Sequence, residues 1–149
     1  MSNTDLINLY SGRILELATN IPLTERLETP DASVKRRSPL CGSTVTVDVK
    51  VEDGKIVAFG QDVKACALGQ ASASVVAAQI VGQSHETVTR ARDQLKAMLK
   101  DNGPVPDAPF DGLEVLIPAR DFKNRHASIM LALEATTEAL EIAEQAQSA

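Results

Sequence analysis

The two cysteines of this chain, Cys41 and Cys66, are the residues whose type and spacing are best suited to chemistry. Between them, residues 44–51 alternate strictly between polar residues and valine, Asp53-Gly54 gives a tight-turn signal, and residues 56–63 form a second β-like run. This pattern predicts a β-hairpin, whose two open ends meet at one edge of the sheet. We therefore expect the two thiols to converge there, where they could share a metal ion or a redox site.

Cys66 also opens a stretch of small residues, because positions 65–84 carry no charged side chain and are rich in Ala, Ser and Gly. A stretch of about 20 residues is long enough to raise the question of a membrane span, but its Ser, Gln and Gly content favours a helix buried in a soluble domain. Free N–H groups and the positive end of the dipole favour a thiolate at such a helix start. Cys66 is thus placed as a metal ligand or nucleophile would be, while a small buried apolar residue is the alternative.

Apolar residues at the helical period predict three further helices, at residues 6–21, 84–102 and 122–145. His126 lies on the apolar stripe of the last helix. A histidine there can be a hydrogen-bonded core residue or a metal ligand, and the pattern leaves both readings open.

The rest of the chain gives weaker signals. Residues 32–37 fit a short edge strand, residues 23–30 are irregular, and the apolar run 113–118 is unsettled, with a single helical turn as one option. In the predicted strand 44–51, the valines should face the core and the polar residues should face water.

Composition limits the classes of function. The 149 residues carry a net charge of −5 with 3% aromatic residues, which fits one globular domain and gives no sign of a nucleic-acid groove. The first residues lack the basic region of a secretory signal peptide, so we expect a cytoplasmic protein that does not enter membranes, with thiols or ligands rather than a disulfide. Phosphate-loop, dinucleotide-binding, Cys-x-x-Cys and His-Glu-x-x-His motifs are missing from the sequence.

Four short runs resemble the IscU/SufU/NifU-type iron–sulfur cluster scaffolds: Pro39-Leu40-Cys41-Gly42, Lys64-Ala65-Cys66, Ala71-Ser72-Ala73-Ser74 and Arg125-His126-Ala127-Ser128-Ile129-Met130. The SufU branch is the nearer match, because the helix 84–102 and its Pro-rich tail lie where that branch carries an insertion. The resemblance implies a single α+β domain over residues 1–149, with a helical insertion at about 84–109. Its small antiparallel β-sheet, of about three strands, should pack against a layer of helices.

In this family, three cysteines and an aspartate form the metal site. The resemblance places the first two cysteines on Cys41 and Cys66, the aspartate on Ser43, and the third cysteine on His126. Serine is a poor ligand for zinc or iron, whereas imidazole is a competent one. The implied set is therefore two cysteines and one histidine with an open fourth position, and only Cys41 or Cys66 could carry a persulfide. The family's chaperone-recruiting motif is missing, since Ile117-Pro118-Ala119-Arg120 matches it at one proline only.

The resemblance implies a non-enzymatic iron–sulfur cluster assembly scaffold or carrier, which binds iron or a [2Fe–2S] cluster through Cys41, Cys66 and His126. The alternatives are a zinc-dependent, SufU-like sulfur acceptor, which would act as a sulfurtransferase, and a degenerate scaffold fold kept as a binding module. The implied partners are a cysteine desulfurase and apo iron–sulfur recipient proteins, with the chain as a monomer or weak homodimer.

Overall fold

In the computed structural model, which describes residues 10–39 and 42–148, the chain forms a three-stranded antiparallel sheet in the order β1-β2-β3. The strands are β1 (Ala32–Arg37), β2 (Thr44–Glu52) and β3 (Lys55–Lys64). The predicted edge strand, hairpin and α+β class are confirmed. Asp53 and Gly54, at φ 52° and 76°, make the turn between β2 and β3.

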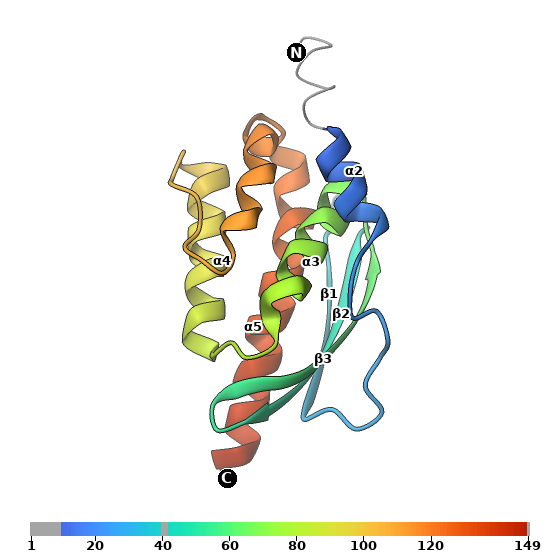
Figure 1. Cartoon of the computed structure of the whole chain (residues 1–149), viewed down its shortest axis with the longest axis vertical. Helices are drawn as coiled ribbons and strands as arrows, with labels where there is room; N and C mark the ends of the chain where they lie inside the picture. Colours follow the sequence, from blue (N-terminus) through green and yellow to red (C-terminus); the bar gives the residue numbers. More distant parts are fainter. Residues whose placement is uncertain (1–9, 40–41, 149) are drawn as a thin grey trace.

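Helices cover one face of the sheet (Figure 1). The α-helices are α2 (Gly12–Thr19), α3 (Ala67–Ile80), α4 (His85–Lys100) and α5 (His126–Ser148), with 3-10 helices η1 (Asp111–Asp121) and η2 (Lys123–Arg125) before α5. α5 packs along β1 and β2, α3 lies beside α5, and α4 and η1 add a further layer of helix (Figure 1). Residues 6–9 of the first predicted helix lie outside the described residues. No helix in the described part of the chain is long and apolar enough to span a membrane.

The valines of β2 face the helices as predicted, and Val45, Val47 and Val49 are each 0% exposed. The prediction that the polar residues of β2 face water is wrong for Asp48, which is also 0% exposed. The segment between α2 and β1 crosses the outer face of the sheet at this point. Arg26 Nε lies 2.6 Å from Asp48 Oδ2, and Ser33 Oγ donates to Asp48 Oδ1 at 2.6 Å.

Gly60 on β3 allows this crossing. A Cβ at position 60 would overlap the Glu25 carbonyl oxygen, so the backbone can approach the sheet only over a glycine. Nearer the open end of the hairpin, the polar residues of the outer face still reach solvent: Thr46 is half-buried and Lys64 is exposed. Alternation in β2 therefore predicts the inner face correctly. It fails for part of the outer face, because nothing in the sequence of β2 indicates that another segment covers it.

The unsettled run 113–118 belongs to η1, which is longer than the single turn considered from sequence. Buried residues recur at every third position from before η1 to after it: Phe110, Leu113, Leu116, Ala119 and Phe122. A 3-10 helix has three residues per turn, so this spacing places all of them on one face. The last helix starts at His126 rather than at Phe122, because η2 precedes it.

Candidate functional site

Cys66 lies where the open end of the hairpin meets the start of α3. Thr44 of β2 pairs with Lys64 of β3, so the residues that precede β2 and those that follow β3 lie at the same end of the sheet. Cys66 is the N-cap residue of α3, and its carbonyl accepts a hydrogen bond from Gln70 N–H at 2.9 Å. Its side chain is half-buried. The prediction that Cys66 opens a buried helix is confirmed.

A second helix contributes to this end of the sheet through Ser128 of α5. The Ser128 hydroxyl lies 3.4 Å from Cys66 Sγ and donates to Ser43 Oγ at 3.1 Å. Both serines are buried, at 1% and 4% exposure. A chain of polar contacts thus joins the hairpin, α3 and α5 at the sulfur atom of Cys66.

Ser43, where the resemblance places the family's aspartate, is linked to Cys66 through the Ser128 hydroxyl. It follows Cys41 by two residues in the sequence. Ser38 N–H donates to the Ser43 carbonyl at 2.8 Å, and Gly42 N–H donates to the Ser38 carbonyl at 2.9 Å. Cys41 itself lies outside the described residues, so the convergence of the two thiols stays a prediction.

His126 is the first residue of α5 and is 4% exposed. Its Nε2 lies 2.9 Å from the Ala119 carbonyl oxygen and 3.1 Å from that of Arg120. Carbonyl oxygens only accept, so Nε2 carries the hydrogen and the neutral ring has Nδ1 left for a metal. These are the contacts of a hydrogen-bonded core histidine, the alternative to a ligand considered from the sequence.

His126 and Ser128 point in different directions. Residues two apart in an α-helix are separated by about 200° around the axis. Ser128 faces Cys66, whereas His126 lines a cavity of about 420 Å³ with residues from the end of α4 and from η1, among them Leu99, Lys100 and Arg120. The structure therefore brings Ser128, rather than His126, to the sulfur of Cys66. Within residues 10–39 and 42–148, no group of three or more His, Cys, Asp and Glu side chains could hold a metal ion.

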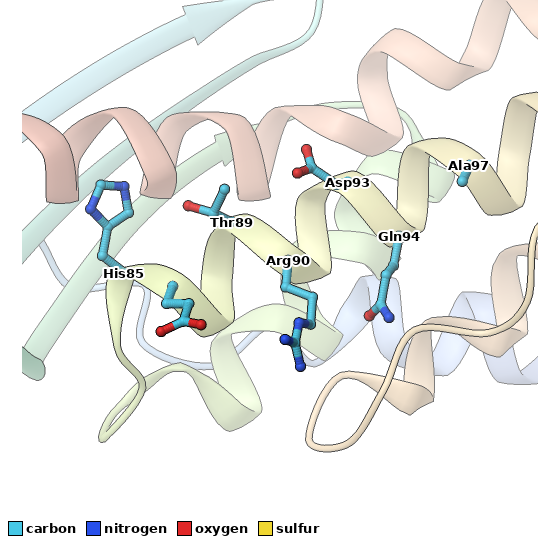
Figure 2. A pocket seen from close by; sticks show the side chains of 7 residues that line it. His85, Thr89, Arg90, Asp93, Gln94 and Ala97 are labelled. Atoms are coloured by element: carbon cyan, nitrogen blue, oxygen red, sulfur yellow. The ribbon is translucent and has the colours of Figure 1, made fainter.

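Another hollow, of about 860 Å³, runs along α4 (Figure 2). Its lining comes from one helix and includes His85, Arg90 and Asp93. His85 Nδ1 lies 2.9 Å from Glu144 Oε2, which links the start of α4 to the end of α5. Of the predicted site residues that the structure describes, Ser43, Cys66 and His126, none lines this hollow.

Ser128 is the site residue that sequence reasoning missed. It stands inside the run from Arg125 to Met130 that carries the family resemblance, but a serine in a helix gives no sign of which neighbour it meets. Its contact with Cys66 depends on how α5 crosses α3.

The fold, with a half-exposed cysteine at the end of its hairpin, can be compared with known families. The NifU-like N-terminal domain model matches residues 9–113, and the chain belongs to this family of iron–sulfur cluster assembly scaffold proteins.

Individual relatives agree with this assignment. The iron–sulfur cluster assembly scaffold protein IscU of Thermotoga maritima is 23% identical over 132 residues, which cover 89% of this chain and 92% of that protein. The crystal structure of a nitrogen-fixing NifU-like protein (N-terminal) from Brucella abortus has a TM-score of 0.92 at 42% identity, covering 95% of this chain and 98% of that one. A putative SUF-system scaffold protein from Fervidobacterium islandicum shares the fold, with a TM-score of 0.79 at 20% identity over 90% of this chain and 98% of that one. The predicted resemblance to the IscU/SufU/NifU scaffolds is confirmed.

Proposed function

We propose that this protein holds iron or a [2Fe–2S] cluster through Cys41, Cys66 and His126 and passes it to apo iron–sulfur proteins. The observation that carries this proposal is the place of Cys66, half-exposed at the start of α3 and linked through the Ser128 hydroxyl to Ser43 at the open end of the hairpin. Ser43 is two residues from Cys41 in the sequence, so Cys41 is expected at the same end of the fold.

The donor set suits a soft metal, since thiolates and imidazole bind iron and zinc, whereas the hydroxyls of Ser43 and Ser128 are poor ligands. Because Nε2 of His126 already donates to two carbonyls, Nδ1 is the atom with which it would bind. The ring would also have to leave its present cavity to share a metal with Cys66. Binding through His126 is thus expected to rearrange residues 119–126.

The second candidate is a zinc-bound sulfur acceptor for a cysteine desulfurase, which the partial exposure of Cys66 favours. The Cys66 thiolate would attack the outer sulfur of a persulfide on the desulfurase. The S–S bond of the donor then breaks, its cysteine leaves as a thiolate, and Cys66 carries the persulfide. Zinc and iron content after anaerobic purification separates this role from the scaffold role.

The test is anaerobic reconstitution of the full chain with iron and sulfide, followed by metal analysis and the visible absorption spectrum. Wild type should take up iron and sulfide, and Cys66→Ser should lose most of both. Ser72→Ala is the matched control, because Ser72 is buried between α3 and α5 but donates to the Ile129 carbonyl instead of lying at the sulfur. Equal iron uptake by wild type and Cys66→Ser would contradict the proposal.

His126→Ala tests the third ligand separately. A ligand role predicts lost metal with a melting temperature close to that of wild type. A structural role predicts unchanged metal and a lower melting temperature, because the Ala119 and Arg120 carbonyls lose their donor, at a cost of about 1–3 kcal/mol. Unchanged metal stoichiometry in His126→Ala would remove His126 from the site while leaving the cysteines in it.

A further inference from the structure

The contact between Ser128 and Cys66 carries an inference about how the sulfur atom is held. Cys66 Sγ and Ser128 Oγ are 3.4 Å apart, and Ser128 Oγ lies 3.1 Å from Ser43 Oγ. A serine hydroxyl has one hydrogen to donate and two lone pairs that accept. Because Ser128 has a single hydrogen, its hydroxyl can donate to Ser43 or to the sulfur of Cys66, but not to both at once.

When the sulfur of Cys66 binds a metal, the hydrogen of this contact has to come from Ser128. The bound form of cysteine is the thiolate, which has no hydrogen and can only accept. The Ser128 hydroxyl then has a charged acceptor at hydrogen-bond distance, and such charge-assisted bonds are about twice as strong as neutral ones. Rotation about the Cβ–Oγ bond of Ser128 is enough to redirect its hydrogen.

Ser128 is held where it can do this. A Cβ at Gly69 of α3 would overlap Ser128 Oγ, so the hydroxyl packs directly against the α3 backbone two positions into its first turn. Ser128 is 1% exposed, so water does not compete for the hydroxyl as it would at the surface.

We propose that Ser128 is a positioning residue for Cys66, whose hydroxyl contacts the sulfur in the empty protein and donates a hydrogen bond to it when it binds a metal. This inference rests on the proposed role of Cys66 as a ligand or sulfur acceptor. The proton that Cys66 loses goes to solvent, and the Ser128 proton stays on its oxygen throughout. Partners of this kind orient ligands and tune their affinity in metal sites.

The first test measures the sulfur without any metal. In a Cys41→Ala background, Cys66 is the only thiol, and its alkylation by iodoacetamide at one fixed pH is followed by intact-protein mass. The Ser128 hydroxyl contacts Cys66 Sγ and orients it for attack on the reagent. Ser128→Ala should therefore react several-fold more slowly, whereas Ser72→Ala, which removes a buried hydroxyl from the same helix interface, should react at the rate of the parent.

Equal rates for Ser128→Ala and Ser72→Ala would overturn the proposal, and so would faster alkylation in Ser128→Ala, since Ser128 would then only shield the sulfur. Gly69→Ala is a second variant, whose Cβ would meet the Ser128 hydroxyl and the Ala65 side chain; it displaces the hydroxyl without removing it and should also slow alkylation. Gly69→Ala decides the question if Ser128→Ala does not fold.

The second measurement uses Co²⁺ with both cysteines present, and reads the sulfur-to-metal charge-transfer absorption. Ser128→Ala should bind Co²⁺ about 10-fold more weakly than Ser72→Ala and shift this absorption. Failure of the parent protein to bind Co²⁺ or iron would count against the proposed function, whereas the alkylation rates would still decide the role of Ser128. Equal Co²⁺ affinity and an unshifted absorption in the two serine variants would overturn the role of Ser128 alone.

Discussion

Asp48 is a buried charged residue that stabilises this fold. Burial alone would raise the pKa of its carboxyl, but hydrogen bonds from Arg26, from Ser33 and from Leu27 N–H outweigh that effect and hold the pKa below its ordinary value. The charged form is thus the one that the folded state prefers. This stabilisation is fully present above the unfolded pKa, near 4, and is lost as pH falls through the lower folded value.

We expect Asp48→Asn to lower the free energy of unfolding by about 2 kcal/mol at pH 7, because the bonds to a charged acceptor become neutral ones. Urea unfolding at pH 7 and at pH 3 checks this, and the difference from wild type should shrink at pH 3. Asp62→Asn is the matched control, since Asp62 is half-exposed and lies 3.8 Å from Lys64 Nζ; it should cost less than about 1 kcal/mol. Equal losses in the two variants would contradict the role assigned to Asp48.

Single residues of the candidate site were predictable to different degrees. Cys66 was found because its signals are local: a preceding β-like run and a following stretch of small residues. Ser128 was not found, since its role depends on α5 crossing α3 at Gly69, over 50 positions away in the sequence. The burial of His126 followed from the helical period, but its hydrogen-bond partners lie in η1, whose structure the pattern had left unsettled.

At the scale of elements, the central strand β2 has different surroundings on its two faces. Its valines bury one face against α5, and its outer face is covered by the segment before β1 near Asp48 and half-open near Thr46. Two adjacent residues of one strand, Thr46 and Val47, therefore have opposite surroundings. Thr46 lies between Lys35 of β1 and Asp62 of β3 on the outer face.

We expect Val47→Asp to destabilise the protein by about 4 kcal/mol or more, because it buries a carboxylate without a partner. Thr46→Asp should change stability by less than about 1 kcal/mol, since Lys35 and Asp62 on either side have opposing effects on a new negative charge. Thermal unfolding of both variants by circular dichroism is the measurement. Similar losses of melting temperature in the two would mean that the faces are assigned wrongly.

The elements themselves followed from the sequence wherever one periodicity persisted. Alternation predicted β2, and the 3.6-residue period predicted α4 and most of α5. The exceptions arise where a segment distant in the sequence covers a residue, or where buried residues recur with a different period. The segment over Asp48 covers what alternation assigns to water, and buried residues at every third position make η1 a 3-10 helix.

At the scale of the whole molecule, the apolar core and the candidate site are adjacent but separate. The core joins the sheet to α3, α4, η1 and α5, and Cys66 only packs against its border. Wholly buried side chains such as Leu68, Leu95 and Leu133 lie in helices, and none of them is a predicted ligand. The fold is thus expected to stand without metal, unlike small zinc domains whose metal replaces a core.

Metal removal tests this separation on the full chain. After treatment with a chelator, the protein should keep its circular dichroism spectrum and unfold cooperatively. Adding metal should then raise the melting temperature with concentration, by the equivalent of about 2.7 kcal/mol at 100 times Kd, because the ligand binds only the folded state. Cys66→Ser should match the chelated wild type in melting temperature and show no rise with metal. Unfolding on chelation would instead mean that the ligands hold the sheet to α3, and that the core described above is insufficient alone.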